Sequence, residues 1–380
     1  MTEARRAVGV PIRVLYVTLR GDRPEAETFI GLARRGCRVR ACCLADTPHR
    51  ERFREAGIEV VPIPLKGRID RESIRALRRE LAAEPVDILH LVGNRAVSNG
   101  LLAVRAFPDV KVIAYRGIVG NVSFLSPMSW LRYLNPRIDR VICVADAIRR
   151  HFVEMRFLGM RLRPEKFVTI HKGHDLAWYT ATPADLREHD IPDGAFVVGC
   201  VANMRPRKGI DVLVRALGQL PADAPIYLLL VGRMESAELD RLIAESPARE
   251  RIRKLGFRRD APAVIAACDA AVLPSIRREG LPKTVIEAMA YAVPPIVTDV
   301  GGSPELVDDR VHGLVVPPGD ADALAAAILE LYGDPALRAK LGAAARERIA
   351  RDFTIDATIE KTLAVYRDVL TRCAPAKQET

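Results

Sequence analysis

A regular alternation of short apolar runs and helical patterns constrains the fold more than any other feature of the chain. Six runs rich in β-branched residues lie in the first half, at residues 12–18, 39–44, 60–62, 88–92, 110–115 and 140–144. Helical patterns separate the first five, at residues 25–35, 50–56, 71–84 and 96–106. Apolar strands joined by helices are typical of a parallel sheet that helices cover on both faces.

A second series of the same kind follows. Its strand-like runs are residues 196–201, 226–231, 252–255, 270–273 and 295–298, and its helical patterns are 210–220, 236–245, 261–267, 284–291 and 322–331. A chain of 380 residues is too long for one ordinary core. We therefore predict an α/β protein of two Rossmann-like domains, with residues 175–194 as the linker. Ligands of such sheets bind outside the carboxyl ends of the strands, and we expect two such edges to face each other across a cleft.

The basic charge is concentrated in the first half. The net charge of the whole chain is +10, but residues 1–175 carry 32 basic and 19 acidic side chains, whereas the remainder is slightly acidic. Aromatic residues make up only 5% and do not interleave with the arginines, which argues against nucleic acid as a partner. An anionic substrate or an anionic membrane surface bound by the first domain explains the excess, and solvated helix faces remain the alternative.

Cysteine use and hydropathy indicate the cytoplasm. The seven cysteines are scattered and mostly lie in apolar runs, with no C-x-x-C pair to suggest zinc or a disulfide framework. No segment approaches 18 uninterrupted apolar residues. The first apolar run, residues 8–19, contains Pro11 and Arg13 and is interpreted as a strand rather than a signal peptide.

Glu279 and Glu287 enclose the most informative segment, a Gly/Pro turn that runs into a small and apolar helical pattern. A loop entering a helix presents unpaired N–H groups at the positive end of the helix dipole, which favours an anion. Two carboxylates would repel a lone phosphate. They suit an anion with hydroxyl-rich groups on both sides, which is the shape of a sugar–diphosphate–nucleoside. Helix capping is the alternative reading of both glutamates.

Four motifs in order resemble those of the family 4 glycosyltransferases, which are retaining enzymes of the GT-B fold. They lie at residues 201–211, 279–289, 300–305 and 312–320. Phe353 and Tyr366, in an amphipathic segment, resemble the C-terminal helix that crosses back onto the first domain in that fold. The resemblance implies an acceptor-binding domain over 1–180, a nucleotide-sugar domain over 181–352, and a crossover helix and tail over 353–380.

The resemblance also assigns roles within the second domain. Glu287 matches the glutamate that binds ribose hydroxyls, Glu279 the one that holds donor-sugar hydroxyls, and Lys208 the lysine that neutralises the diphosphate. Charge that grows on a leaving diphosphate calls for a cation and aimed N–H groups. Because the lysine and the N–H groups supply the positive charge, we expect no metal and no cofactor, with the nucleotide sugar as donor substrate.

The sequence departs from the family pattern near the diphosphate. Asn203 stands where an arginine is common, and Arg205 or Arg207 could supply the second cation; Arg205 is preferred. Pro282 replaces a frequent glycine and removes one N–H donor, for which Lys283 and Thr284 could compensate. The remaining expected donor-binding residues are Gly280, Leu281, Arg258 beside the nucleobase, and Gly21 in the first loop.

In the first domain Arg116 stands where the family often carries a histidine near the reacting sugar. An arginine binds phosphate or a hydroxyl but is no base near pH 7, which suits a front-face retaining mechanism. A structural ion pair is its alternative role. Residues 117–135 form the expected acceptor-side loop, whose apolar residues beside a basic flank suit a lipid-linked acceptor; burial in the domain core is the alternative.

These observations predict a retaining, metal-independent glycosyltransferase. Its donor is a nucleotide diphosphate sugar, and its acceptor is a glycan or glycolipid in cell-surface polysaccharide or lipopolysaccharide assembly. The expected location is the cytoplasm, with the inner membrane face as a peripheral site. The alternatives are an inactive nucleotide-sugar-binding partner subunit, and an enzyme that epimerises or hydrolyses the donor alone.

Overall fold

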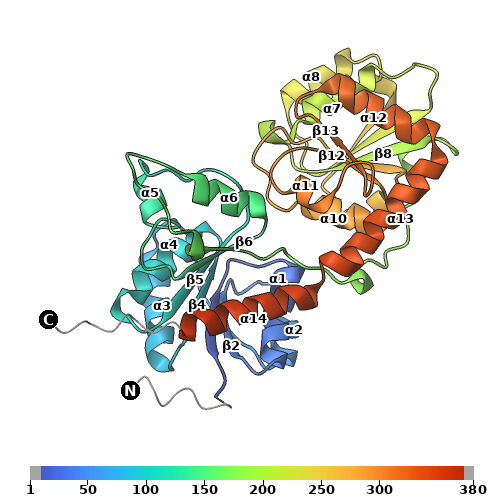
Figure 1. The fold of residues 1–380 in the computed structure, drawn as a ribbon. Coiled ribbons are helices and arrows are strands. Elements are labelled where there is room, and N and C mark those ends of the chain that lie inside the picture. The colour runs from blue at the N-terminus through green and yellow to red at the C-terminus, as the bar shows by residue number, and fades with distance from the viewer. Residues whose placement is uncertain (1–9, 372–380) are drawn as a thin grey trace. The chain divides into compact units, whose positions relative to one another are not determined.

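The computed structural model of the chain describes residues 10–371. These residues divide into two compact units (Figure 1). Unit 1 combines the chain up to Gly173 with the segment from Ile355 onward, and unit 2 comprises His174–Thr354. Each unit has its own parallel sheet and its own core.

Unit 1 contains a seven-stranded parallel sheet in the order β3-β2-β1-β4-β5-β6-β7. The strands are β1 (Arg13–Val17), β2 (Arg38–Cys43), β3 (Glu59–Pro62), β4 (Ile88–Val92), β5 (Lys111–Arg116), β6 (Arg140–Cys143) and β7 (Phe167–Thr169). The helices are α1 (Arg23–Arg34), α2 (Arg50–Glu55), α3 (Arg71–Ala83), α4 (Asn94–Ala103), α5 (Pro127–Trp130), α6 (Asp146–Glu154) and α14 (Ile355–Thr371). The central strands are buried because helices cover the sheet, as their apolar composition predicts.

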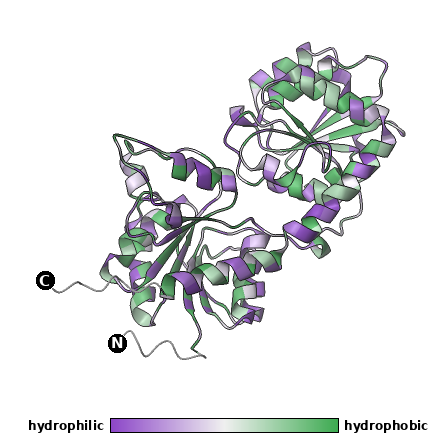
Figure 2. Ribbon diagram, in the orientation of Figure 1, coloured by the Kyte–Doolittle hydropathy of each residue, from purple (hydrophilic) through white to green (hydrophobic). Residues whose placement is uncertain are grey.

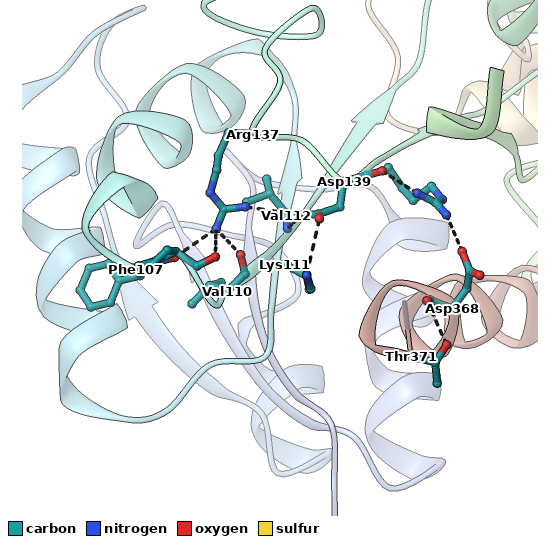
Figure 3. A network of polar contacts seen from close by, with 10 residues as sticks. Phe107, Val110, Lys111, Val112, Arg137, Asp139, Asp368 and Thr371 are labelled. Atoms are coloured by element: carbon teal, nitrogen blue, oxygen red, sulfur yellow. Dashed lines mark hydrogen bonds and ion pairs between the residues drawn. The ribbon is translucent and has the colours of Figure 1, made fainter. Parts of the chain in front are cut away.

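Helix α14 belongs to unit 1 although the whole of unit 2 precedes it in the chain. It packs beside α1 (Figure 1) and buries Tyr366, whose hydroxyl lies 2.6 Å from Nδ1 of His90 on β4. Figure 3 shows its second attachment, where Asp368 accepts a 2.6 Å bond from Arg140 of β6. The crossover predicted from Phe353 and Tyr366 is therefore present. Residues 372–380, the predicted tail with Cys373, lie outside the described residues.

Arg137 anchors the loop that precedes β5 in unit 1. Its guanidinium donates to the carbonyl groups of Phe107, Pro108 and Val110 (Figure 3). The carboxylate of Asp139 accepts from the N–H of Val112 at 2.7 Å. These contacts satisfy backbone groups that would otherwise lose their water on burial.

Unit 2 contains a six-stranded parallel sheet in the order β10-β9-β8-β11-β12-β13. The strands are β8 (Phe196–Val201), β9 (Ile226–Val231), β10 (Ile252–Gly256), β11 (Ala270–Leu273), β12 (Pro295–Thr298) and β13 (Leu314–Val316). The helices are α7 (Ile210–Gly218), α8 (Ala237–Glu245), α9 (Ala261–Ala266), α10 (Lys283–Ala290), α11 (Ser303–Leu306), α12 (Ala321–Gly333) and α13 (Pro335–Asp352). Figure 2 shows the strands mostly in the colours of apolar residues, while the helices carry polar and apolar residues side by side.

The predicted fold class of two parallel-sheet, Rossmann-like domains is confirmed. The predicted linker is not a free connection, because residues 175–194 pack on unit 2. The Ala184 N–H bonds to the Ala263 carbonyl at 3.0 Å, and Ile191 lies in the core of that unit. The six cysteines within residues 10–371 are buried and free. None of the helices in that range combines the length and the apolar character needed to cross a membrane.

Candidate active site

The strand order of unit 2 places two loops at one point. From β8 the chain builds outward to β9 and β10 on one side, and β11, β12 and β13 lie on the other. The loops that leave the carboxyl ends of β8 and β11 therefore diverge at a topological switch point, where doubly wound sheets bind ligands. Lys208 follows β8 and Glu279 follows β11, so the fold brings together two residues that are 71 positions apart.

The carboxylate of Glu279 is the centre of a polar cluster. Its Oε1 atom lies 2.7 Å from Nζ of Lys208 and 3.1 Å from Nη1 of Arg207. The Ser275 hydroxyl donates to the same oxygen at 2.7 Å. Glu279 is only 5% exposed, and two cations with one hydroxyl compensate the loss of water around its charge. All these contacts use Oε1, so Oε2 is the oxygen left to accept a hydroxyl from a ligand.

Two glycines allow this cluster to form. Gly209 has φ of 65°, and a Cβ atom there would lie 2.1 Å from the Pro274 carbonyl oxygen. Gly301, with φ of 61°, would in the same way place a Cβ atom 2.3 Å from the carbonyl oxygen of Glu279. Only glycine tolerates both the conformation and the close approach. The loops after β8 and β12 therefore each make a close backbone contact with the loop after β11, which carries Glu279.

Helix α10 directs free N–H groups toward the end of the Glu279 loop. Pro282 is its N-cap, and residues 10–371 offer no hydrogen-bond acceptor to the backbone N–H groups of Gly280, Leu281, Lys283 and Thr284. Pro282 has no N–H group to donate. As the N-cap, however, it is only one of several residues at this end of the helix, and the N–H groups of the others have no partner within the helix. Four N–H groups remain available to an anion despite the proline.

Glu287 lies one turn inside α10 and is largely buried. Its Oε1 atom forms an i,i+4 ion pair with Nζ of Lys283 at 2.9 Å. Lys283 is exposed, so this pair is solvent-screened and contributes little to stability. Each glutamate thus has a lysine as partner, Lys208 for Glu279 and Lys283 for Glu287.

The other donor-binding residues predicted in unit 2 do not join this cluster. Asn203 uses its side-chain oxygen to accept from the Arg233 N–H at 3.1 Å. Arg205 is exposed, and its guanidinium makes no hydrogen bond or ion pair within residues 10–371. Arg258 pairs with Asp260 at 2.6 Å in the turn before α9. The cation that contacts Glu279 beside Lys208 is Arg207.

Burial also sets the protonation of a neighbouring thiol. Cys200, the fifth residue of β8, is fully enclosed, and this burial raises the pKa of its thiol to about 12, although Lys208 acts in the opposite direction. The thiol is therefore neutral at physiological pH and is no nucleophile. Residues 10–371 contain no group of three or more His, Cys, Asp or Glu side chains placed to hold a metal ion.

In unit 1 the predicted residues lie at the carboxyl edge of the sheet, after β1 and at the end of β5. Arg116 is 4% exposed; its Nε donates to the Ile118 carbonyl at 2.9 Å, and its Nη2 donates to that of Gly120. Its guanidinium also stacks 4.7 Å from the Tyr133 ring centroid. These contacts fix the start of the predicted acceptor-side loop. The predicted Gly21 lies between β1 and Asp22, the N-cap of α1.

A charged group at this edge was not anticipated from the sequence. Lys172 lies 2.7 Å from Asp22, and with Glu25, Tyr115 and His90 it lines a cavity of about 30 Å³. Burial alone would lower the pKa of Lys172, but Tyr115, Asp22 and Glu25 raise it, so the ammonium group is retained. Burial raises the pKa of Glu25 and lowers that of His90 to about 3. The sequence carried no signal for this group, because Lys172 and Asp22 are 150 residues apart in the chain.

The sequence indicates Arg207 only weakly, and Ser275 not at all, as partners of Glu279. Arg207 was visible as a basic residue next to Lys208, but nothing in the sequence orients the short 3₁₀ turn Pro206–Lys208. Ser275 carried no signal at all. Its position two residues after β11 and four residues before Glu279 is what allows its hydroxyl to reach the carboxylate.

Comparison with known proteins gives the same assignment for both units. Residues 26–178 match the family model described as Glycosyltransferase Family 4, and residues 182–348 match the model described as Glycosyl transferases group 1. Together the two matches span most of the described chain. The boundary between them lies close to the division between unit 1 and unit 2.

Relatives of known activity include a phosphatidyl-myo-inositol mannosyltransferase of Mycolicibacterium smegmatis. It is 30% identical over 305 residues, which are 78% of this chain and 76% of the relative. A D-inositol 3-phosphate glycosyltransferase of Salinispora arenicola is 29% identical over 57% of this chain, and the match spans about half of the relative, 52%.

Solved structures share the fold. A glycosyltransferase from Rickettsia africae superposes with a TM-score of 0.79 at 20% identity, covering 96% of this chain and all of that one. The Anabaena protein HepE, solved in complex with UDP-glucose, gives a TM-score of 0.74 at 23% identity over 93% of this chain and all of its own. The sequence motifs, the paired parallel sheets and these matches lead to one assignment: the chain belongs to family 4 of the glycosyltransferases.

Proposed function

We propose that the protein is a retaining glycosyltransferase that moves a sugar from a nucleotide diphosphate sugar to a glycan or lipid-linked acceptor in the assembly of a cell-surface polysaccharide or lipopolysaccharide. One observation carries the proposal: the Glu279 carboxylate, held by Lys208 and Arg207, lies beside the free N–H groups at the start of α10. The inositol-glycosylating relatives and the UDP-glucose complex of HepE support the substrate class.

In this proposal the diphosphate is bound by the N–H groups at the start of α10 and by Lys208. Glu279 accepts hydrogen bonds from hydroxyls of the donor sugar through Oε2, and Glu287 accepts them from the ribose. The loop around Arg258 lies beside the nucleobase. Each carboxylate thus contacts a hydroxyl-bearing end of the donor, while cations and N–H dipoles contact its charged centre.

The reaction proposed is a front-face displacement. The bond between the anomeric carbon and the diphosphate oxygen breaks, and the acceptor oxygen bonds to that carbon on the same face. The leaving phosphate oxygen takes the acceptor proton. Negative charge grows on the diphosphate as the bond breaks, so fixed N–H groups and a buried lysine stabilise the transition state more than the ground state. Arg116 contributes by holding the acceptor-side loop at the end of β5.

The proposed reaction needs no metal and no cofactor, because the lysine and the helix dipole supply the positive charge. Purified protein is to be screened against UDP-, GDP- and ADP-sugars, first by thermal shift and then by donor hydrolysis. We expect one donor to raise the melting temperature and to be hydrolysed slowly, with EDTA leaving the rate unchanged and Glu279→Ala abolishing it.

Other outcomes of this screen separate the alternatives. Nucleotide binding without turnover in the presence of acceptors would indicate the inactive partner subunit, which Asn203 and Pro282 would suit. Donor epimerisation or rapid hydrolysis without any effect of acceptor would indicate an enzyme acting on the donor alone. Strict dependence on a divalent cation would refute the account of the leaving group given above.

We propose that the enzyme acts in the cytoplasm, at the inner face of the membrane that holds its acceptor. The excess of basic residues in the first half of the chain supports this location. A lipid-linked acceptor presents its sugar at that surface, so an enzyme that approaches the membrane gains access to it.

Arg207 is expected to matter more to donor binding than Arg205. Arg207 touches Glu279, whereas Arg205 is exposed, so the charge of Arg207 lies closer to the site of the diphosphate. We expect Arg207→Ala to lower kcat/KM for the donor by about tenfold to a hundredfold, and Arg205→Ala by less than about threefold. Steady-state kinetics of both variants check this. Equal losses, or a larger loss for Arg205→Ala, would contradict it.

A further inference from the structure

Unit 1 carries a compact group of large apolar side chains, most of them open to solvent and one of them, Phe124, buried. This group, here called the apolar corner, consists of Phe124, Leu125, Trp130, Phe157, Leu158 and Met160. Leu125 is 72% exposed and Leu158 is 87% exposed, with Trp130 and Met160 also open to solvent. They come from the loop before α5, from α5 itself and from the turn after α6, at one corner of the unit (Figure 1). Single exposed apolar residues need no explanation, but a cluster of this kind usually marks an interaction site.

Specific contacts join these segments into one surface. The rings of Phe124 and Phe157, 33 residues apart in sequence, are nearly parallel with centroids 6.5 Å apart. The Trp130 indole packs against Phe124 at 6.1 Å and donates its N–H to the Phe124 carbonyl at 2.7 Å. The aromatic rings therefore form a base, and Leu125 and Leu158 project beyond it.

The turn that carries Leu158 goes against local preference. Phe157 and Met160 exchange backbone hydrogen bonds, with Leu158 and Gly159 at φ of 47° and 78°. Two positive φ values define a type I′ turn, for which Asn-Gly is the favoured pair. A leucine there has both an unfavourable backbone conformation and an exposed apolar side chain. Neither stability nor solubility explains the residue, which indicates that its role is to contact something apolar.

Arginines surround the corner. Arg156, Arg161 and Arg163 flank the turn and are exposed. Within residues 10–371, the guanidinium groups of Arg161 and Arg163 make no ion pair and no hydrogen bond, and the segment 155–163 contains no acidic residue. Apolar tips among unpaired cations are complementary to an anionic bilayer, where the tips enter the interface and the cations meet lipid phosphates.

We propose that the apolar corner docks on an anionic membrane surface by inserting Leu158 and Leu125 between lipid headgroups. A bilayer fits this surface because the unpaired arginines match lipid phosphates, while the leucine side chains, which carry no polar group, match the acyl region beneath them. The inference rests on the proposed function, since a membrane-held acceptor gives docking its purpose. Vesicle binding, however, is measured without donor or acceptor, so docking and transfer can fail independently.

Leu158→Asn provides a sharp test because it is expected to preserve the fold. Asparagine favours positive φ and creates the preferred Asn-Gly turn, while it removes the apolar tip. Sedimentation is to be measured with vesicles of phosphatidylcholine alone and of phosphatidylcholine with one quarter phosphatidylglycerol. The full chain is expected to bind the anionic vesicles at least tenfold more strongly, and Leu158→Asn to weaken that binding by about tenfold.

The charge component is tested by Arg161→Gln with Arg163→Gln, which should weaken binding and make it less sensitive to salt. Val311→Asn, at a 51% exposed position in unit 2, is the matched control and should bind as the unaltered chain does. Absence of the full chain from both vesicle pellets would overturn the proposal. Binding that Leu158→Asn leaves unchanged would also overturn it, as would self-association that this substitution abolishes without any vesicle binding.

Discussion

Replacing Lys208 by alanine is expected to lower kcat for donor turnover by about 10²–10³-fold, with a smaller change in KM. Lys208 is the more buried of the two cations on Glu279, with a side chain 15% exposed. In the proposed reaction its charge acts mainly on the diphosphate as the glycosidic bond breaks, so its loss should affect the transition state more than the bound donor. The substitution also leaves the buried Glu279 with one cation fewer. Steady-state kinetics with the donor found by the screen measure both parameters.

Two further variants make this prediction specific. Lys340→Ala removes an exposed lysine from α13 of the same unit and should leave kcat unchanged. Lys208→Arg keeps the charge in a larger, planar group and should retain more activity than alanine while remaining below the unaltered protein. If Lys208→Ala lowers only the affinity for donor and leaves kcat intact, the lysine binds the ground state and the proposed mechanism is wrong.

Replacing Tyr366 by alanine is expected to destabilise unit 1 by about 3–5 kcal/mol. Tyr366 is fully buried between α14 and the sheet, and its hydroxyl bonds to Nδ1 of His90, itself buried. The variant loses a packed ring and leaves a polar nitrogen without its partner. Unit 1 can be followed alone, since the chain has two tryptophans and Trp178→Phe leaves only Trp130, in unit 1. Urea unfolding monitored by Trp130 fluorescence gives the free-energy difference.

Graded substitutions separate packing from hydrogen bonding. Tyr366→Phe removes only the hydroxyl and should cost about 1–2 kcal/mol. Leu370→Ala, on the same helix at a 37% exposed position, should cost less than about 1 kcal/mol. Equal effects of Tyr366→Ala and Leu370→Ala would mean that the stability of unit 1 does not depend specifically on the buried contact between Tyr366 and His90.

The architecture could be predicted from sequence because its elements are strongly patterned. Buried strands such as β9 and β11 are continuous apolar runs, and the helices between the strands have clear periodicity. The strands that escaped prediction, β7 and β13, have three residues each and lie at sheet edges. So short a run has no periodicity to detect, and its strand form depends on the neighbour that pairs with it.

The candidate site was predictable in part for a related reason. Strand order determines which loops meet at a switch point, so the approach of Lys208 to Glu279 follows from the fold. The choice between Arg205 and Arg207 does not. It depends on the orientation of one 3₁₀ turn, which is set by its tight contact with the loop after β11, where Gly209 meets the Pro274 carbonyl. Such contacts between distant segments leave no pattern in either segment alone.

The division of unit 1 into two separate stretches of chain determines the order in which the two units are completed during synthesis. A ribosome completes every strand and helix of unit 2 before it reaches α14. All segments of unit 2 are therefore made while the earlier unit still has its α1 surface and His90 uncovered. The half of the molecule that is translated first is the half that is completed last, and chaperones that recognise exposed apolar surface have the longest access to it.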